Sequence, residues 1–271
     1  MPTKLSLTNF YKRAPLLKVS NLSKSYFSPK GEMLPVLDKI SLNLYKNEFV
    51  SVIGQSGCGK STLLDCISGL SRPDQGKVNL NGIDITGSIG MLSYMMQDDV
   101  LLPWRTLEQN VMLPMQLGRK FNKYEAQERI SRLAKIFGLN KFLNYYPYQL
   151  SGGMKQRVSL MRACISNKEI LLLDEPFAKL DSLTRTQIQT WFLRIWRNNK
   201  LTVLMVTHDI DEALYLSNRI YVFSAKPAKI IAEINLPSIS PKNVDNLLKP
   251  QYISVKKKLL SILHLNSLKF A

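Results

Sequence analysis

The sequence predicts an α/β fold built on a mostly parallel β-sheet, and three observations support this class. Short apolar runs of strand length recur along the chain, as is typical of parallel strands covered on both faces. A stretch before the first run alternates apolar and polar residues, which predicts an antiparallel β subdomain. From about residue 98 to 165 helical patterns dominate, which predicts a helical subdomain inserted into the α/β domain. The apolar runs are residues 49–53, 170–173, 203–206 and 220–223, and Asp174 and Glu175 follow the second of them.

The first half of the chain is expected to supply most of the antiparallel strands. Residues 1–15 are expected to form a loosely attached lead, and residue 16 begins a domain that extends to residue 236. Residues 36–44 alternate as a half-buried strand should, and turn residues around 78–80 predict a hairpin. Apolar residues 91–96 predict a further strand that ends at Gln97.

Helices and buried strands alternate in the second half of the chain. One amphipathic helix is expected to end at Gly138, and a second spans residues 185–197. Residues 230–234 are expected to pair with the run at 220–223. Residues 237–271 are expected to form a basic, weakly helical tail.

Composition places the chain among ordinary globular proteins. Of its 271 residues, 45% are hydrophobic and 21% are charged, and no apolar run approaches the roughly 18 residues needed to cross a bilayer. The N-terminus lacks the apolar segment of a signal peptide, and the three cysteines have neither metal-ligand nor disulfide spacing. These observations predict a protein that stays in the cytoplasm.

The net charge of +17 is concentrated at the two ends of the chain. Residues 1–30 and 226–271 each contribute +6. Basic ends of this kind can contact nucleic acid or an anionic membrane surface. They can equally be solvated segments that keep the protein soluble, and this second interpretation is the simpler one.

A glycine-rich stretch follows the first apolar run and fits the phosphate-binding pattern G-x-x-x-x-G-K-[ST]. Its glycines let backbone N–H groups surround phosphate oxygens at the positive end of the following helix. Lys60 is expected to reach the β- and γ-phosphates, and Ser61 to ligate Mg²⁺. A helix N-terminus could lower the pKa of the Cys58 thiol, but a small residue that fits the loop is the simpler interpretation. The candidate nucleotide-binding residues are Gly54, Gln55, Ser56, Gly57, Cys58, Gly59, Lys60, Ser61 and Thr62.

Two further motifs suit phosphate chemistry. Asp174, at the mouth of a buried strand, can hold Mg²⁺, and Glu175 beside it can polarise an attacking water. Residues 150–153, Leu-Ser-Gly-Gly, enter a helix and form a second anion site of exposed N–H groups. One triphosphate needs only one such anion site, so the second site is expected to close on the nucleotide of a neighbouring molecule.

With these motifs in this order, residues 17 to 235 resemble the ATP-binding cassette (ABC) family, whose fold is a P-loop NTPase core with an antiparallel β subdomain and a helical insertion. The resemblance adds Gln97 as the glutamine loop, Asp181 in the D-loop and His208 as the switch histidine. It implies that two such domains form a head-to-tail dimer with ATP between the P-loop of one and Ser151, Gly152 and Gly153 of the other.

The resemblance also implies a role for each matching residue. Glu175 is expected to be the general base, His208 to hold the γ-phosphate, and Asp181 to couple the two sites. Gln97 is expected to contact Mg²⁺ and the water. Tyr26 matches the aromatic residue that stacks on adenine, with Phe27 as the alternative.

A narrower resemblance rests on residues 102–106, Leu-Pro-Trp-Arg-Thr, and on residues 224–230. Both are similar to the ATPases of bacterial importers for nitrate, sulfonates, taurine and pyrimidine precursors. This implies a permease subunit in contact with the region of Trp104, a periplasmic solute-binding protein acting indirectly, and a peripheral position on the cytoplasmic face of the cell membrane. Asp98 and Lys179 depart from the pattern of that group without removing a catalytic residue.

Two other functions compete with transport. The net charge leaves open a cassette ATPase acting on nucleic acid or translation, but Gln97 and Ser151 are too close in sequence to enclose a long coiled coil. Translation factors of this kind also carry two cassettes in tandem, so no nucleic-acid partner is expected. A regulator without turnover is disfavoured because Glu175 and His208 are both present.

Overall fold

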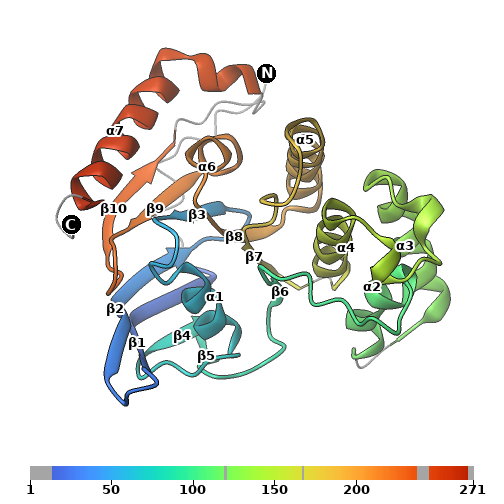
Figure 1. The fold of residues 1–271 in the computed structure, drawn as a ribbon, viewed down its shortest axis with the longest axis horizontal. Helices are drawn as coiled ribbons and strands as arrows, with labels where there is room; N and C mark the ends of the chain where they lie inside the picture. The colour runs from blue at the N-terminus through green and yellow to red at the C-terminus, as the bar shows by residue number, and fades with distance from the viewer. Residues whose placement is uncertain (1–13, 119–120, 167, 237–243, 268–271) are drawn as a thin grey trace.

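The computed structural model describes residues 14–118, 121–166, 168–236 and 244–267, which form two β-sheets flanked by helices (Figure 1). Residues 1–13 of the expected lead and residues 237–243 of the expected tail lie outside the described residues. The predicted combination of a parallel sheet, an antiparallel sheet and a helical insertion is confirmed.

The larger sheet has six strands in the order β10-β9-β3-β8-β7-β6. Neighbouring strands are parallel except for β10, which runs antiparallel to β9. Every residue of β3, β7, β8 and β9 is buried, which explains why most positions in these strands are apolar. The strands are β3 (Phe49–Ile53), β6 (Ser93–Met95), β7 (Ile170–Asp174), β8 (Thr202–Thr207), β9 (Arg219–Phe223) and β10 (Ile230–Asn235).

The smaller sheet has four antiparallel strands in the order β2-β1-β4-β5. Its strands are β1 (Leu17–Phe27), β2 (Met33–Leu44), β4 (Gln75–Leu80) and β5 (Ile83–Asp84). Apolar residues of β1 and β2 share one core with α1 (Lys60–Ser68) and with one face of the larger sheet. This packing places α1 between the two sheets, as Figure 1 shows.

The helical insertion lies at the far side of the molecule from the smaller sheet (Figure 1). It contains α2 (Leu107–Gln116), α3 (Lys123–Ile136) and α4 (Gly152–Ile165). Thr106 caps α2 in a capping box with Gln109, and α3 ends before Gly138, whose φ of 65° favours glycine. Buried residues of these helices join the sheet in one core that also contains α5 (Ser182–Asn199).

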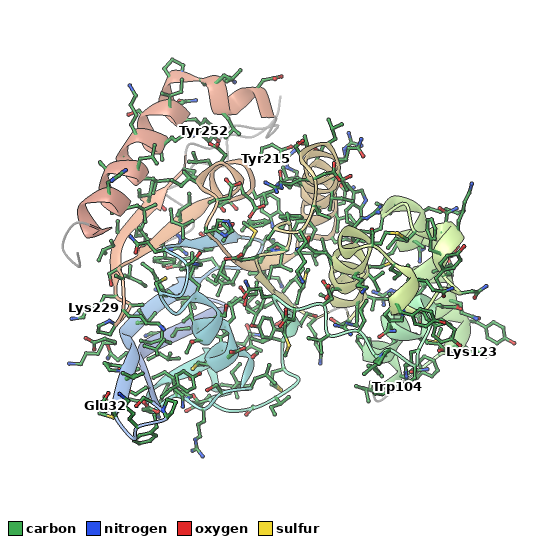
Figure 2. The ribbon with its side chains drawn as sticks, in the orientation of Figure 1. Glu32, Trp104, Lys123, Tyr215, Lys229 and Tyr252 are labelled. Atoms are coloured by element: carbon green, nitrogen blue, oxygen red, sulfur yellow. The ribbon has the colours of Figure 1, made fainter. Side chains whose placement is uncertain are left out.

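The C-terminal segment contains a regular helix, α7 (Pro250–Ser267), packed on the larger sheet and on α6 (Ile210–Leu216). Tyr252 and Leu259 are buried in this contact, and Tyr252 lies between α7 and the rest of the domain in Figure 2. Lys256 forms an ion pair of 2.6 Å with Asp211. Within the described ranges no helix is both long and apolar enough to cross a membrane.

Candidate nucleotide site

The glycine-rich loop connects the end of β3 to the start of α1. Gly59 has a φ of 118°, and a Cβ there would lie 2.9 Å from Cγ1 of Val36. Both the backbone conformation and the close approach of β2 therefore require glycine at this position. The loop leads directly into Lys60, the first residue of α1, so its N–H groups face the positive end of the helix.

Lys60 is held inside this loop. Its side chain is buried, and its Nζ donates hydrogen bonds of 2.9 Å to the carbonyl oxygens of Gly54 and Gln55. An ammonium group has three N–H donors, so one remains for a phosphate oxygen. Burial raises the pKa of the neighbouring Cys58 thiol, which makes Cys58 a small neutral residue of the loop rather than a reactive one.

A cavity of about 300 Å³ opens in front of the loop. It brings together residues from six parts of the sequence: Tyr26, Val36, Ser56, Gly57, Gly59, Lys60, Ser61, Thr62, Gln97, Glu175 and Lys226. Tyr26 lines the cavity, whereas Phe27 is 78% exposed and is not among the lining residues. The geometry therefore favours Tyr26 as the stacking residue.

Lys226 is a lining residue that sequence reasoning missed. It lies in the loop between β9 and β10, which is fixed to β2 by a hydrogen bond of 2.8 Å from Ala228 N–H to the carbonyl of Val36. Its segment, residues 224–230, carries part of the narrower resemblance, but nothing in the sequence marks this side chain as facing a nucleotide. A cation here adds to the positive character that Lys60 gives the cavity.

Asp174 lies at the end of β7, with its carboxylate next to Ser61. The Ser61 hydroxyl hydrogen-bonds this carboxylate, while the other oxygen, Oδ1, is buried without a partner. Burial raises the pKa of Asp174 to about 6. A buried, unpaired carboxylate oxygen beside a serine hydroxyl fits the hard oxygen ligands that Mg²⁺ prefers. Among the described residues no group of three His, Cys, Asp or Glu side chains could hold a metal, so phosphate and water would supply its other ligands.

Glu175 is in contact with His208 across the end of the sheet. His208 Nδ1 lies 3.1 Å from Glu175 Oε1, and the side chain of Glu175 is only 13% exposed. Glu175 has a φ of 46°, which is uncommon for a residue with a side chain and is characteristic of functional sites. This backbone is fixed by a 3.0 Å hydrogen bond from Glu175 N–H to the carbonyl of Val206. A carboxylate held in this way can orient a water.

The Leu-Ser-Gly-Gly motif is not brought to the same cavity. Ser151 caps α4 by accepting a hydrogen bond of 3.3 Å from the N–H of Met154, and a Cβ on Gly152 would meet no atom within 4 Å. None of residues 150–153 lines the cavity in front of the P-loop. Asp181 is likewise outside it and caps α5 through Thr184 N–H at 3.0 Å. The exposed N-terminus of α4 is open to another molecule.

Glu212 is a second residue that sequence reasoning missed. It lines a small cavity with His208 and Glu175, and its side chain accepts a hydrogen bond of 3.0 Å from Gln189. Burial and, to a smaller extent, the nearby Asp209 raise the pKa of Glu212 to about 7, although Thr207, Gln189 and Arg185 oppose the shift. An acid in the middle of this segment gives no sequence signal of such burial.

The raised pKa of Glu212 predicts a pH-dependent stability. Its folded-state pKa of about 7 exceeds the ordinary 4.5, so its contribution is fully present below pH 4.5 and is lost as pH rises through 7. In the parent protein this group should lower the unfolding free energy by on the order of 3 kcal/mol over that pH range. We expect Glu212→Gln, which does not titrate, to lack this part of the fall. Urea unfolding of both proteins at pH 4.5 and 7.5 measures this.

The matched control for that measurement is Glu128→Gln, because the Glu128 side chain is 72% exposed. It should leave the pH dependence of the parent unchanged. If Glu212→Gln shows the same fall in stability as the parent, folding does not raise the pKa of Glu212.

Taken together, a glycine-rich phosphate loop after β3, a buried lysine and an Asp–Glu pair at the end of the parallel strand β7, with β8 between the two strands, define a P-loop ATPase. Within that class, the chain belongs to the ABC transporter family, whose model matches residues 37–178. It is therefore an ATP-binding cassette with the hydrolase activity of its family.

Relatives cover nearly the whole chain. The chain is 41% identical over 246 residues to an aliphatic sulfonates import ATP-binding protein of Bacillus cereus, covering 90% of this chain and 94% of that protein. It is 40% identical over 255 residues to the bicarbonate transport ATP-binding protein of Synechococcus elongatus, covering 92% and 91%. A dimeric, post-hydrolysis ATP-binding cassette bound to ADP and Pi is similar in structure, with a TM-score of 0.74, 32% identity, and coverage of 82% of this chain and 100% of that chain.

Proposed function

We propose that this chain is the ATP-hydrolysing subunit of an importer that takes up small solutes of the nitrate, sulfonate and taurine kind through a partner permease. The observation that carries the proposal is the cavity that joins Lys60, Gln97 and Glu175 in front of the P-loop. The names of the two relatives, one for sulfonate import and one for bicarbonate transport, support transport over the nucleic-acid alternative.

In this proposal the residues of the nucleotide site have separate tasks. Tyr26 stacks on the adenine, while the loop N–H groups and the free N–H of Lys60 bind the phosphates. Ser61, Asp174 and Gln97 would hold Mg²⁺, which when bound neutralises phosphate charge. Glu175 orients the attacking water and accepts its proton, and His208, 3.1 Å from Glu175, is close enough to bind the γ-phosphate.

We further propose that the active form is a head-to-tail homodimer. Ser151, Gly152, Gly153 and Asp181 lie outside the cavity of their own chain, and the helix N-terminus that carries the three signature residues is exposed. An exposed helix N-terminus is suited to an anion supplied by another molecule. The similar cassette of known structure is itself a dimer, which supports this arrangement.

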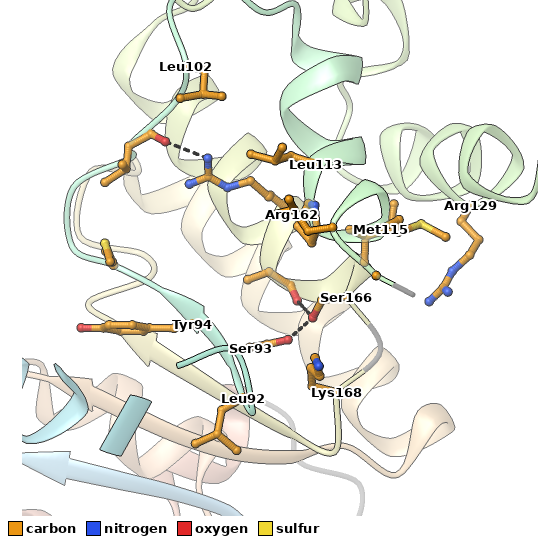
Figure 3. A pocket seen from close by; sticks show the side chains of 18 of the residues that line it. Leu92, Ser93, Tyr94, Leu102, Leu113, Met115, Arg129, Arg162, Ser166 and Lys168 are labelled. Atoms are coloured by element: carbon orange, nitrogen blue, oxygen red, sulfur yellow. Dashed lines mark hydrogen bonds between the residues drawn. The ribbon is translucent and has the colours of Figure 1, made fainter. Parts of the chain in front are cut away.

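The permease is proposed to dock on the helical insertion. A groove of about 760 Å³ lies between β6 and helices α2 and α4 (Figure 3). Its walls include Leu92, Leu113 and Met115, while Arg129 and Lys168 contribute positive charge. Such a groove suits a short amphipathic helix that carries an acidic side chain. Docking of this kind would place the chain at the cytoplasmic face of the membrane.

Trp104 marks the outer part of this docking region. It follows Leu102, which lines the groove, and it is 71% exposed at the surface of the helical insertion (Figure 2), so it is not a core aromatic. We expect Trp104→Ala to spare ATP binding and to weaken attachment to the permease, since exposed tryptophans are common interface anchors. Co-purification with the permease measures the loss.

The control for this variant is Ile83→Ala, which removes a 68% exposed apolar side chain from the smaller sheet. It should co-purify with the permease at the parent level. Full recovery of the permease with Trp104→Ala would show that this tryptophan is not part of the contact.

The proposed function as a whole is tested by co-expressing the chain with a candidate permease. ATP-dependent uptake of a labelled sulfonate into vesicles should require the chain and should stop with Glu175→Gln. ATPase activity that is stimulated by RNA or DNA, and not by the permease, would favour the nucleic-acid alternative.

A further inference from the structure

The signature helix α4 is connected to the catalytic segment of its own chain by one buried side chain. Gln156, which is 2% exposed, donates a hydrogen bond of 3.1 Å from Nε2 to the carbonyl oxygen of Glu175. Its Oε1 accepts a hydrogen bond of 2.9 Å from the N–H of Lys179. The single amide therefore holds both ends of the segment that runs from Glu175 to the D-loop.

A second contact joins the same two parts of the chain. A Cβ built on Gly153 would lie 3.4 Å from Cδ2 of Leu180 and 3.6 Å from the carbonyl oxygen of Lys179. The N-terminal turn of α4 thus lies close to the D-loop at Gly153 and is joined to it through Gln156. The signature motif, the D-loop and the segment after Glu175 form one packed unit.

The hydrogen bond from Gln156 is made to a residue whose backbone conformation is strained. Glu175 adopts a φ of 46°, a conformation that persists only where the surroundings fix it. Its N–H is bound to Val206 at 3.0 Å, and its carbonyl is bound to Gln156. Removing the bond from Gln156 releases the carbonyl of Glu175, the residue whose side chain faces His208.

We propose that Gln156 is a positioning residue, which fixes the carboxylate of Glu175 and links it to the position of the signature helix. The inference rests on the proposed function, in which α4 closes on the partner subunit's nucleotide while Glu175 acts on the nucleotide of its own chain. Closure of one site then sets the orientation of the base in the other through a direct hydrogen bond, with no intervening residue.

The test compares Gln156→Met with the parent in the full-length chain. Methionine keeps the length of the side chain and removes both hydrogen bonds. We expect kcat for ATP hydrolysis to fall roughly tenfold because the carboxylate of Glu175 is less well positioned, with KM for ATP unchanged. A residue that serves only the packing of the core would lower the melting temperature and leave kcat of the folded protein unchanged.

Asn110→Leu is the control, because Asn110 is a buried amide on α2 that hydrogen-bonds the backbone of Leu102 and Thr106 and neither Glu175 nor the D-loop. It should lower the melting temperature without the tenfold loss of kcat. An equal loss of kcat in both variants would overturn the inference.

Gln156→Glu provides a test that does not depend on the fold of the methionine variant. While ionised, the introduced carboxyl can accept from Lys179 N–H but cannot donate to Glu175, and protonation restores the donor. Its kcat relative to the parent should therefore rise as pH falls, and a ratio that is constant with pH would overturn the inference. A parent chain without ATPase activity would overturn the proposed function, whereas an active parent matched in kcat by Gln156→Met would overturn this inference alone.

Discussion

Glu175→Gln should lower kcat for ATP hydrolysis by roughly 10² or more, the scale of a lost general base. The change keeps the size of the side chain but removes its charge and its basicity. ATP should still bind, since Lys60 and the loop N–H groups are unchanged, and it should remain trapped between two subunits. Turnover assays and light scattering together measure the two effects: ATP should give dimers, and ADP should return the variant to monomers.

Two outcomes would contradict parts of this expectation. Hydrolysis at the parent rate would show that Glu175 is not the base. A variant that stays monomeric at saturating ATP would argue against a shared site in the isolated subunit. Glu128→Gln, an exposed carboxylate on α3, is the control for the change of charge and should hydrolyse ATP like the parent.

Lys60→Ala should weaken ATP binding about 10- to 100-fold. The change removes a charge-assisted contact to the phosphates, worth about 1.5–3 kcal/mol, and each 1.4 kcal/mol is a factor of ten in affinity. It also leaves the carbonyls of Gly54 and Gln55 without the donor they now share, which loosens the cradle itself. Direct titration with a non-hydrolysed ATP analogue measures the affinity.

Lys77→Ala serves as the control for loss of a positive charge, because the Lys77 side chain is 70% exposed on the smaller sheet. Its affinity for the analogue should equal that of the parent. Unchanged affinity in Lys60→Ala would count against the assignment of residues 54–61 as the phosphate cradle.

The sequence correctly predicted those elements whose structure depends on residues close together in the chain. Strand β3 is apolar at four of its five positions, and Gly69 ends α1 with a φ of 84°, so both were visible in short windows. Strand β6 was predicted at 91–96 but spans only Ser93–Met95. It lies at the edge of the sheet, where β7 alone pairs with it, and pairing rather than apolar character sets its length.

What the sequence did not predict depends on contacts between distant segments. Gln156, Glu212 and Lys226 are ordinary polar residues until the fold brings them to Glu175, Gln189 and the P-loop cavity. The roles assigned to the site residues stay predictions, because the cavity shows which residues meet and the proposed experiments decide what each does.

Helix α7 changes what must be kept in a recombinant fragment. The family match spans residues 37–178, yet β3 within it is flanked by β8 and β9, which both lie beyond that range. A fragment cut to the matched residues would leave the P-loop strand at an unpaired edge, open to aggregation. A cut after residue 236 would keep the sheet but remove Tyr252 and Leu259, exposing the apolar surface they cover. We therefore expect a fragment that extends through α7 to be more stable than one that ends at residue 236.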